Sequence, residues 1–340
     1  MFKGKKILIT GGTGSLGQAL TKRLLEYDVD AVRIFSRNEN KQVQMEEELH
    51  DSRLRFLIGD IRDSERLKRA FEEIDIVYHA AALKHVPVIE YNPFEAIKTN
   101  IIGSQNVIDA ALYQNVDKVV CIGTDKAVSP VNTYGATKLL MEKLFVTAMN
   151  YFSHNKHNTK FVALRYGNVL GSSGSVVPKF IEQIIAKKNI TITDPNMTRF
   201  SLTMNEALDF ILEATEISQG SEVFIPKLLK AYSIRDLKKA LEEIFWEVDE
   251  KIISIRQGEK MHESLLNSDE MKYTWEFNNK FVVFDEVKEF SFLEKYYPGI
   301  KKLDSNHAIS SELAEKMSVD EIKMKIKNSG ILNKYEKFIP

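Results

Sequence analysis

The sequence has little cysteine and no long hydrophobic run. Cys121 is the single cysteine among 340 residues, so no internal disulfide can cross-link the chain. It lies in an apolar run, where we expect a packed thiol. The apolar run after the N-terminal lysines is cut short by glycines, and no later stretch approaches membrane-spanning length. These absences predict a soluble cytoplasmic protein that does not enter a membrane.

Neither sign of charge is in excess. The 47 basic and 48 acidic residues leave a formal net charge of -1. Such a chain has no global positive field, which argues against a nucleic acid partner, and any anion must be bound by a local site. His85 and His262 stand near other polar residues, but no pair of His, Cys or carboxylate residues has the spacing of metal ligands. We therefore predict no nucleic acid partner and no metal.

Short β-branched apolar runs alternate with longer amphipathic stretches in the first half of the chain. This alternation is typical of βαβ units and a parallel sheet. The expected strands are Lys6–Thr10, Ala31–Ser36, Leu54–Ile58, Ile76–His79, Lys118–Gly123 and Lys160–Arg165. The expected helices lie near residues 16–27, 39–49, 64–73, 93–114 and 134–152. The pattern predicts an α/β fold with a Rossmann-type doubly wound parallel sheet.

The strict alternation ends near residue 170, where prolines begin to punctuate shorter elements. We predict a cofactor-binding Rossmann domain over residues 1–170. Residues 171–340 are expected to form mainly a smaller α/β substrate-binding domain at the carboxyl edge of the sheet, with some elements returning to the first domain. A capping-box pattern over Ser318 to Glu321 predicts a short helix near the end of the chain.

A glycine-rich segment follows the first expected strand and opens a helix. Glycines at 11, 14 and 17 allow a tight turn and a close approach of the backbone to a pyrophosphate, while the helix N-terminus supplies amide donors. A purely structural turn is the alternative, but the position between strand and helix favours a dinucleotide. The contact residues expected in this segment are Gly11, Thr13, Gly14, Ser15, Leu16 and Gly17.

The end of the second expected strand distinguishes NAD from NADP. An acidic residue there would bond the ribose 2′-hydroxyl, whereas a basic residue accommodates a 2′-phosphate. This chain has Arg37, with Lys41 one helical turn further, so NADP is predicted; two ordinary surface cations are the alternative. The other residues expected beside the cofactor are Ser36, Asn38, Asp60, Ile61, Ala80, Ala81 and Ala82.

Thr124, Asp125 and Lys126 end the fifth expected strand, and Tyr134 and Lys138 follow. Positions 134 and 138 share one face of a helix, so the lysine can lower the pKa of the phenol and hold the nicotinamide ribose. The alternatives are a core tyrosine beside a solvated lysine, and a surface ion pair at 125 and 126. The place of Tyr134 and Lys138 after a fifth strand, downstream of the glycine segment, favours a catalytic role for these two residues.

Together, the glycine segment and Tyr134-x-x-x-Lys138 resemble the extended short-chain dehydrogenase/reductase family. Within it, nearly the whole chain is similar to the inverting UDP-N-acetylglucosamine 4,6-dehydratases of the pseudaminic-acid pathway. The runs that carry this similarity are AAALKHVPVIEYNPFEAIKTNIIGSQNVIDAA (80–111), TDKAVSPVNTYGATK (124–138), RYGNVLGSSGSVVP (165–178), ITDPNMTRF (192–200) and RQGEKMHE (256–263). Ordinary nucleotide-sugar 4,6-dehydratases have Thr-Asp-Glu where this chain and the inverting group have Thr-Asp-Lys.

The resemblance implies a reaction and a role for each residue. Carbon 4 of a UDP-sugar is oxidised, water is eliminated across carbons 5 and 6, and hydride from tightly bound, recycled NADP returns to carbon 6. Tyr134 would be the base for oxidation, Thr124 would bond the carbon-4 oxygen, Asp125 would be the acid, and Lys126 the base at carbon 5. Lys126 must then be neutral, which requires a lowered pKa. Re-protonation from the opposite face would give a 4-keto-6-deoxy-L-arabino product.

The resemblance also implies a substrate site and an assembly. Residues expected at the UDP-sugar are Lys84, Thr124, Asn168, Val177, Thr193, Met197, Arg199, Arg256 and Glu259, the arginines being suited to bidentate phosphate binding. Relatives form dimers, and the inverting group can form hexamers, so a homo-oligomer is expected. Three positions depart from the family: Gly123 replaces a common Ser, Ser173 a common Arg and Gln257 a common Pro.

Other functions stay open at this point. A dehydratase that retains the carbon-5 configuration would need the same residues. A nucleotide-sugar 4-epimerase or reductase would use Tyr134 and Lys138 but would have no use for Asp125 and Lys126. A catalytically silent NADP-binding sensor is expected to lose the active Tyr or Lys, and this chain has both.

Overall fold

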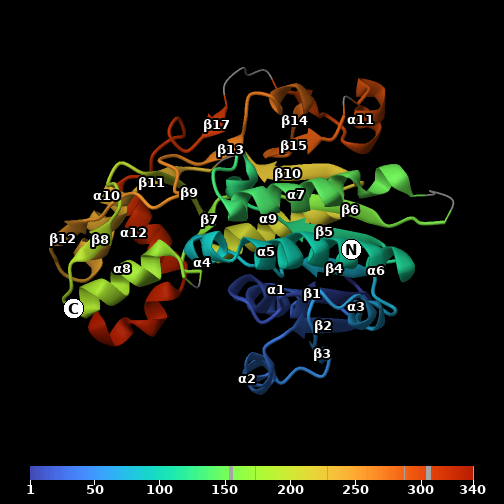
Figure 1. Cartoon of the computed structure of the whole chain (residues 1–340), viewed down its shortest axis with the longest axis horizontal. Helices are drawn as coiled ribbons and strands as arrows, with labels where there is room; N and C mark the ends of the chain where they lie inside the picture. The colour runs from blue at the N-terminus through green and yellow to red at the C-terminus, as the bar shows by residue number, and fades with distance from the viewer. Residues whose placement is uncertain (153–155, 173, 228, 287, 304–307, 340) are drawn as a thin grey trace.

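A large sheet with helices on its faces makes up most of the molecule, and a smaller lobe projects from one end of it (Figure 1). The structure is a computed structural model that describes residues 1–152, 156–172, 174–227, 229–286, 288–303 and 308–339. The N-terminus lies in the large body, and the end of the chain lies in the smaller lobe.

The main sheet has ten strands in the order β16-β14-β15-β10-β6-β5-β4-β1-β2-β3. Neighbouring strands from β3 to β10 run parallel, whereas β15, β14 and β16 are antiparallel. The bounds are β1 Lys6–Thr10, β2 Ala31–Ser36, β3 Leu54–Ile58, β4 Ile76–His79, β5 Lys118–Ile122, β6 Lys160–Leu164, β10 Glu222–Pro226, β14 Thr274–Phe277, β15 Lys280–Phe284 and β16 Lys301–Lys302. The predicted doubly wound α/β sheet is confirmed, with β5 and β6 each ending one residue early.

Helices cover both faces of this sheet because each presents an apolar stripe to it. One buried cluster joins the sheet to α3 (Ser64–Ala70), α6 (Gly103–Tyr113) and α7 (Thr133–Thr147). A second joins the other face to α1 (Ser15–Leu25), α2 (Glu39–Leu49) and α9 (Met204–Ile217). Cys121 lies in the first cluster, fully buried as predicted, and burial raises the pKa of its thiol to about 12.

The helix expected over residues 93–114 is divided into three segments. It begins as α5 (Pro93–Ala96), widens into the π-helical segment η1 (Ile97–Ile102) and continues as α6. Asn100 of η1 is fully buried, and its side chain exchanges two hydrogen bonds with the backbone of Leu83, at 2.8 and 3.0 Å, and donates a third to Thr137 of α7. The wider turn therefore places an amide where it holds the segment after β4 against α7.

The smaller lobe has its own apolar core, built from α8, α10, α12 and the short strands beside them. Its helices are α8 (Val176–Ile185), α10 (Ile234–Ile244) and α12 (Val319–Asn328). The remaining strands are β7 (Asn168–Val169), β8 (Ile190–Ile192), β9 (Thr198–Leu202), β11 (Ala231–Ser233), β12 (Glu250–Ile252), β13 (Ser264–Leu266) and β17 (Ile309–Ser310). The capping box predicted at Ser318 is formed with Glu321, and α12 follows it.

The second half of the chain also supplies the main sheet. Strands β10, β14, β15 and β16 extend it beyond β6, and α9 packs beside α1. The other helical segments are α4 (Val86–Tyr91), η2 (Asp125–Ala127), η3 (Ala148–Tyr151), η4 (Met271–Tyr273), α11 (Phe290–Tyr296), η5 (Ile331–Lys334) and η6 (Glu336–Phe338). Within the described part of the chain, no helix combines the length and the apolar character needed to cross a bilayer.

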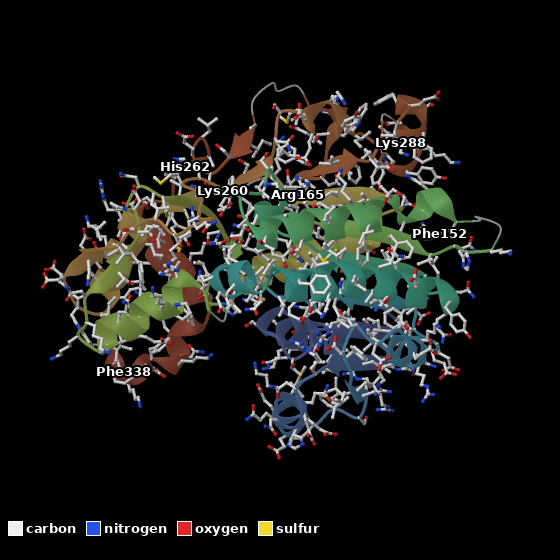
Figure 2. All side chains as sticks on the ribbon, viewed as in Figure 1. Phe152, Arg165, Lys260, His262, Lys288 and Phe338 are labelled. Atoms are coloured by element: carbon white, nitrogen blue, oxygen red, sulfur yellow. The ribbon has the colours of Figure 1, made fainter. Side chains whose placement is uncertain are left out.

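Arg165 lies where the sheet, α7 and the later segments meet (Figure 2). It is fully buried and follows β6 directly. Its guanidinium contacts Glu142 of α7 at 2.5 Å and Glu270 at 2.8 Å, and it donates to the carbonyl of Leu265 in β13 at 2.8 Å. A buried guanidinium needs this many partners because its charge has left water. One side chain thus joins three parts of the fold.

Replacing Arg165 by methionine should therefore leave Glu142 and Glu270 near one another without a cation. We expect Arg165→Met to lower the free energy of unfolding by about 3–5 kcal/mol, the usual result of breaking a buried ion pair. Arg62→Met is the control, because Arg62 also contacts two carboxylates but is exposed, and it should cost less than about 1 kcal/mol. Urea denaturation followed by circular dichroism measures both, and equal losses would contradict the explanation.

Candidate active site

A cavity of about 610 Å³ opens at the carboxyl ends of the central parallel strands. Its lining includes residues from the turns after β1, β2, β3, β4 and β5, and from α7. Every residue predicted to contact the cofactor lines this cavity: Gly11, Thr13, Gly14, Ser15, Leu16, Gly17, Ser36, Arg37, Asn38, Lys41, Asp60, Ile61, Ala80, Ala81, Ala82, Tyr134 and Lys138. The cavity lies where the strand order reverses between β1 and β4, which is where doubly wound sheets bind ligands.

The turn between β1 and α1 requires glycine because other backbone segments pack closely against it. Gly11 has a positive φ of 70°, and a Cβ there would lie 2.8 Å from the backbone of Ala81. A Cβ on Gly17 would lie 2.5 Å from Gly12, where α1 packs against the turn. The N-cap residue, Gly14, has no side chain to cap the helix. The first turn of α1 therefore presents amide groups that suit the phosphates of a dinucleotide.

The segment after β2 carries two cations at the cavity. Arg37 is 57% exposed, and its guanidinium lies 3.8 Å from Asp60. Asn38 caps α2 by accepting from the amide of Lys41 at 2.9 Å. Asp60 is held more closely by Arg62, at 2.7 Å, so Arg37 is not its main partner. Arg37 can therefore turn to an anionic group in the cavity at little cost.

Tyr134 and Lys138 lie at the other end of the cavity, on α7. Burial raises the pKa of Tyr134, and this effect exceeds the opposing influence of Lys126 and of the hydrogen bond with Thr124. The ammonium of Lys138 donates to the carbonyl of Ile122 at 2.6 Å, and burial lowers its pKa to about 8. The net pKa of Tyr134 is thus raised, and the expected lowering of this pKa by Lys138 stays a prediction.

Asp125 and Lys126 follow the lining residue Thr124 but do not themselves line the cavity, and they form an ion pair with Lys126 Nζ 3.0 Å from Asp125 Oδ1. Thr124 donates to the same oxygen at 3.0 Å, and Lys126 also donates to Asn168 at 3.1 Å. Burial raises the pKa of the fully buried Asp125 despite the nearby lysine. A raised pKa suits Asp125 to accept a proton from Lys126 and to pass it on as a general acid.

Lys126 behaves differently from the sequence-based expectation. Burial lowers its pKa, but the negative charges of Asp125 and Glu263 outweigh burial, so the pKa is raised above its usual value. The lowered pKa that the proposed role requires is therefore not found, because Lys126 lies beside Glu263 as well as Asp125. Lys126 can become a base here only by passing its proton to a neighbour, and Asp125 is within hydrogen-bond distance.

Glu263 is the polar residue at this site that the sequence prediction omitted. Its carboxylate lies 3.4 Å from Lys126 and 3.9 Å from Arg199, and only 3% of the residue is exposed. The sequence contains only a weak indication of Glu263, which is the last residue of the run RQGEKMHE and directly precedes the short strand β13. Asn100 was also missed, because the π-helical turn that buries it leaves no obvious pattern in the sequence.

The predicted substrate residues are only partly brought together. Lys84 and Thr124 line the cavity. Asn168 contacts Lys126 beside it. Arg199 donates to the backbone carbonyls of Thr198, Lys260 and Met261 at 2.7–3.1 Å, so it holds this segment in place.

The other predicted substrate residues lie further into the smaller lobe. The side chains of Val177 and Met197 are buried in its apolar core, and Thr193 lies in the loop between β8 and β9. Arg256 and Glu259 lie 3.6 Å apart, and the charge of Arg256 also reaches Lys179 of α8. Lys179 and Arg256 form a second cationic group outside the lining of the cavity.

The segment around Lys260 and His262 connects the two lobes, and Figure 2 shows both residues where the lobes meet. Lys260 donates to the carbonyl of Val128 at 2.7 Å, and Asn132 donates to the carbonyl of Gly258 at 2.7 Å. Gly258 has a φ of 81°, and a Cβ there would lie 2.7 Å from Asn132. The segment is thus fastened to the loop between η2 and α7, which places Glu263 against Lys126.

Two of the three departures from the family can be located. A Cβ on Gly123 would lie 2.3 Å from the carbonyl oxygen of Leu164, so β5 and β6 approach too closely here for a serine. Gln257 is exposed in the turn before Gly258. Ser173 lies outside the described residues.

Among the described residues, no group of His, Cys, Asp and Glu side chains could hold a metal ion.

Several known proteins are similar to this chain in sequence and fold. Residues 7–285 match the family model described as "Polysaccharide biosynthesis protein", and the chain belongs to this family. It is 49% identical over 291 residues to a Campylobacter jejuni protein named "UDP-N-acetylglucosamine 4,6-dehydratase (inverting)", which covers 85% of each chain. It is 40% identical to a Rickettsia bellii protein named "UDP-glucose 4-epimerase", over 95% of each. The solved structure of Pen from Bacillus thuringiensis is 40% identical, with a TM-score of 0.89 over 98% of this chain and 99% of that one.

Proposed function

We propose that this chain is a UDP-N-acetylglucosamine 4,6-dehydratase that inverts carbon 5 and uses a recycled NADP. The observation that carries the proposal is the pair of buried Asp125 and partly buried Lys126, which lie 3.0 Å apart and whose charges act on Tyr134. An elimination needs an acid for the leaving hydroxyl and a base for the carbon-5 proton, and this pair supplies both. The name of the Campylobacter jejuni relative supports the substrate and the inversion.

The cavity residues fit a nicotinamide dinucleotide. The uncapped first turn of α1 and the close turn at Gly11 suit a pyrophosphate, and Lys138 lines the same cavity, where it would hold the nicotinamide ribose. A nicotinamide bound here would supply hydride transfer from carbon 4 and back to carbon 6, and its positive charge would favour the phenolate of Tyr134. As a phenolate, Tyr134 takes the carbon-4 hydroxyl proton, and Thr124, which hydrogen-bonds Tyr134, contacts the same oxygen.

The elimination itself falls to the residues after β5. Once carbon 4 is a ketone, its neighbour carbon 5 becomes acidic. Asp125, with its raised pKa, gives its proton to the hydroxyl that leaves carbon 6 as water. Lys126, having passed its own proton to Asp125, takes the carbon-5 proton. Protons and electrons balance, because one proton leaves carbon 5 and one joins the departing hydroxide.

The purified protein should convert UDP-N-acetylglucosamine to a 4-keto-6-deoxy sugar in deuterated water. We expect deuterium at carbon 5, no net consumption of NADP, and coupling constants of the L-arabino configuration, all measured by proton NMR. Lys126→Ala should slow dehydration by about 10²–10⁴-fold, the usual contribution of a general base. A variant that dehydrates at the normal rate would refute the proposed base.

The same NMR experiment separates the other functions. No keto product would refute the substrate assignment, and a D-configured keto product would indicate retention. The second candidate is a 4-epimerase, which the name of the Rickettsia bellii relative favours. It would give the galacto epimer and would leave Asp125 and Lys126 without a chemical role.

NADP is proposed over NAD because Arg37 and Lys41 face the cavity where a 2′-phosphate would lie. Arg37→Ala should weaken NADP binding by about 10-fold to 100-fold, since a charge-assisted hydrogen bond contributes about 1.5–3 kcal/mol. NAD binding should be unchanged. Arg55→Ala removes an exposed arginine of β3 that does not line the cavity, and it should affect neither cofactor. Calorimetric titration with both cofactors would refute the preference if the wild type binds them equally.

We also propose that the chain forms a homo-oligomer with a second copy of itself. Large apolar side chains are exposed on α4, α5 and α7, which pack beside one another: Tyr91 is 88% exposed, Phe94 61% and Leu140 51%. Such an accumulation of exposed apolar area is typical of an interface.

Location in the cytoplasm and a role in the pseudaminic-acid pathway stay predictions.

Changing Tyr91 and Phe94 together to serine should reduce the oligomer to single chains, because the two substitutions remove most of the exposed apolar area of the proposed interface. Phe290→Ser in helix α11 changes an aromatic residue that is 56% exposed, and it should leave the assembly intact. Sedimentation velocity measures the masses. A wild type that sediments as a single chain would refute the oligomer, and a double variant that stays assembled would refute this interface.

A further inference from the structure

Lys126 contacts two carboxylates rather than the one expected from the sequence. Asp125 is its neighbour in the chain, whereas Glu263 comes from the segment before β13. Both are almost completely buried. Asp125 Oδ2 and Glu263 Oε2 each accept no hydrogen bond from the described residues. Two buried carboxylate oxygens beside one lysine are costly for the fold unless the site uses them.

The two carboxylates have opposite electrostatic environments. Burial raises the pKa of Asp125, and the charge of Glu263 adds to this. Burial also acts to raise the pKa of Glu263, but the positive charges of Lys126, Arg199 and Lys260 outweigh it, so its pKa is lowered. Asp125 is therefore the carboxylate that takes a proton, and Glu263 the one that stays ionised. Such a division of pKa values between neighbouring acids is how a site assigns two roles.

The backbone of Glu263 is held on both sides. Its amide donates to Ser311 Oγ at 2.9 Å, and its carbonyl accepts from the amide of Ser311 at 2.7 Å. Ser311 is itself bonded to Thr198 of β9, at 2.7 Å between the hydroxyls. The carboxylate therefore has little freedom to leave Lys126.

We propose that Glu263 is a positioning residue for the elimination, a permanent anion that fixes Lys126 Nζ and keeps one proton shared between Lys126 and Asp125. This inference rests on the proposed function. In the resting state Lys126 carries the proton and both carboxylates are ionised. The proton moves from Lys126 Nζ to Asp125 Oδ1, which leaves a neutral amine. The amine still donates an N–H to Glu263, so its lone pair is directed away from Glu263 and toward the substrate.

The charge of Glu263 also sets the pH range in which the pair holds one proton. The charged or titratable groups around this cluster include Asp125, Lys126, Tyr134, Arg199, Tyr232, Lys260 and Glu263. A negative charge raises the pKa of both members of the pair, since it favours their protonated forms. Removing that charge should lower both pKa values, and the bell-shaped profile of the elimination rate should move to lower pH as a whole.

Glu263→Gln tests this proposal because it keeps the shape and removes the charge. We expect the oxidation of carbon 4, followed by the absorbance of the reduced nicotinamide in a single turnover, to change less than about threefold. The rates of water release and of deuterium uptake at carbon 5 should fall by at least about tenfold. The largest expected loss is the factor of about 10²–10⁴ that a general base contributes. The pH profile of the remaining elimination should shift to lower pH. Equal losses in both steps, or an unshifted profile, would overturn the proposal.

Two further variants separate this role from a loss of folding. Glu263→Asp keeps the charge, so it should retain the wild-type pH profile while eliminating more slowly. Glu312→Gln makes the same change in net charge at an exposed residue next to Ser311, and it should match the wild type in both steps. Circular dichroism establishes that each variant is folded. A Glu263→Asp profile that shifts as far as that of Glu263→Gln would overturn the role of the charge.

A measurement without turnover distinguishes failure of this inference from failure of the proposed function. In protein with ¹³C at the lysine ε-carbon, the Lys126 signal should stay protonated to a higher pH in the wild type than in Glu263→Gln, with Glu312→Gln following the wild type. Identical titrations in all three would overturn the inference, whatever the substrate. A shifted titration in a protein that does not dehydrate UDP-N-acetylglucosamine would refute the proposed function and leave the positioning of Lys126 supported.

Discussion

The buried guanidinium of Arg165 is the interaction on which the active site's geometry depends. It follows β6 at the centre of the sheet and is neutralised by Glu142 of α7 and by Glu270. Because it also bonds the carbonyl of Leu265, it fixes the strand that begins directly after Glu263. A charge that cannot leave its partners without entering an apolar core holds the helix of Tyr134 and the segment of Glu263 in one frame.

The site has two regions that depend on different interactions. The cofactor end is built from close backbone approaches and a helix N-terminus, so it depends on glycines and on geometry. The chemical end is built from buried charges whose pKa values depend on one another. Asp125, Lys126 and Glu263 cannot be assigned protons one at a time, since each sets the environment of the others.

The smaller lobe takes part in this chemical end as well as enclosing it. Arg199 and Lys260 come from its segments, and both lower the pKa of Glu263. Lys260 and Asn132 fasten the segment to the loop before α7. Segments of the smaller lobe therefore influence the charge states of Lys126 and Glu263.

The sequence by itself determined the doubly wound sheet, the cofactor cavity and the placement of Tyr134 and Lys138. These follow from short-range patterns: apolar alternation, glycine spacing and positions that share a helix face. The tertiary structure decided what spacing cannot express. It brought Glu263 against Lys126, turned Lys138 toward Ile122 and buried Asn100 through a π-helical turn. A pKa depends on the burial and charges supplied by every segment that converges on the group, so the ionisation of Lys126 could be read only after the chain was folded.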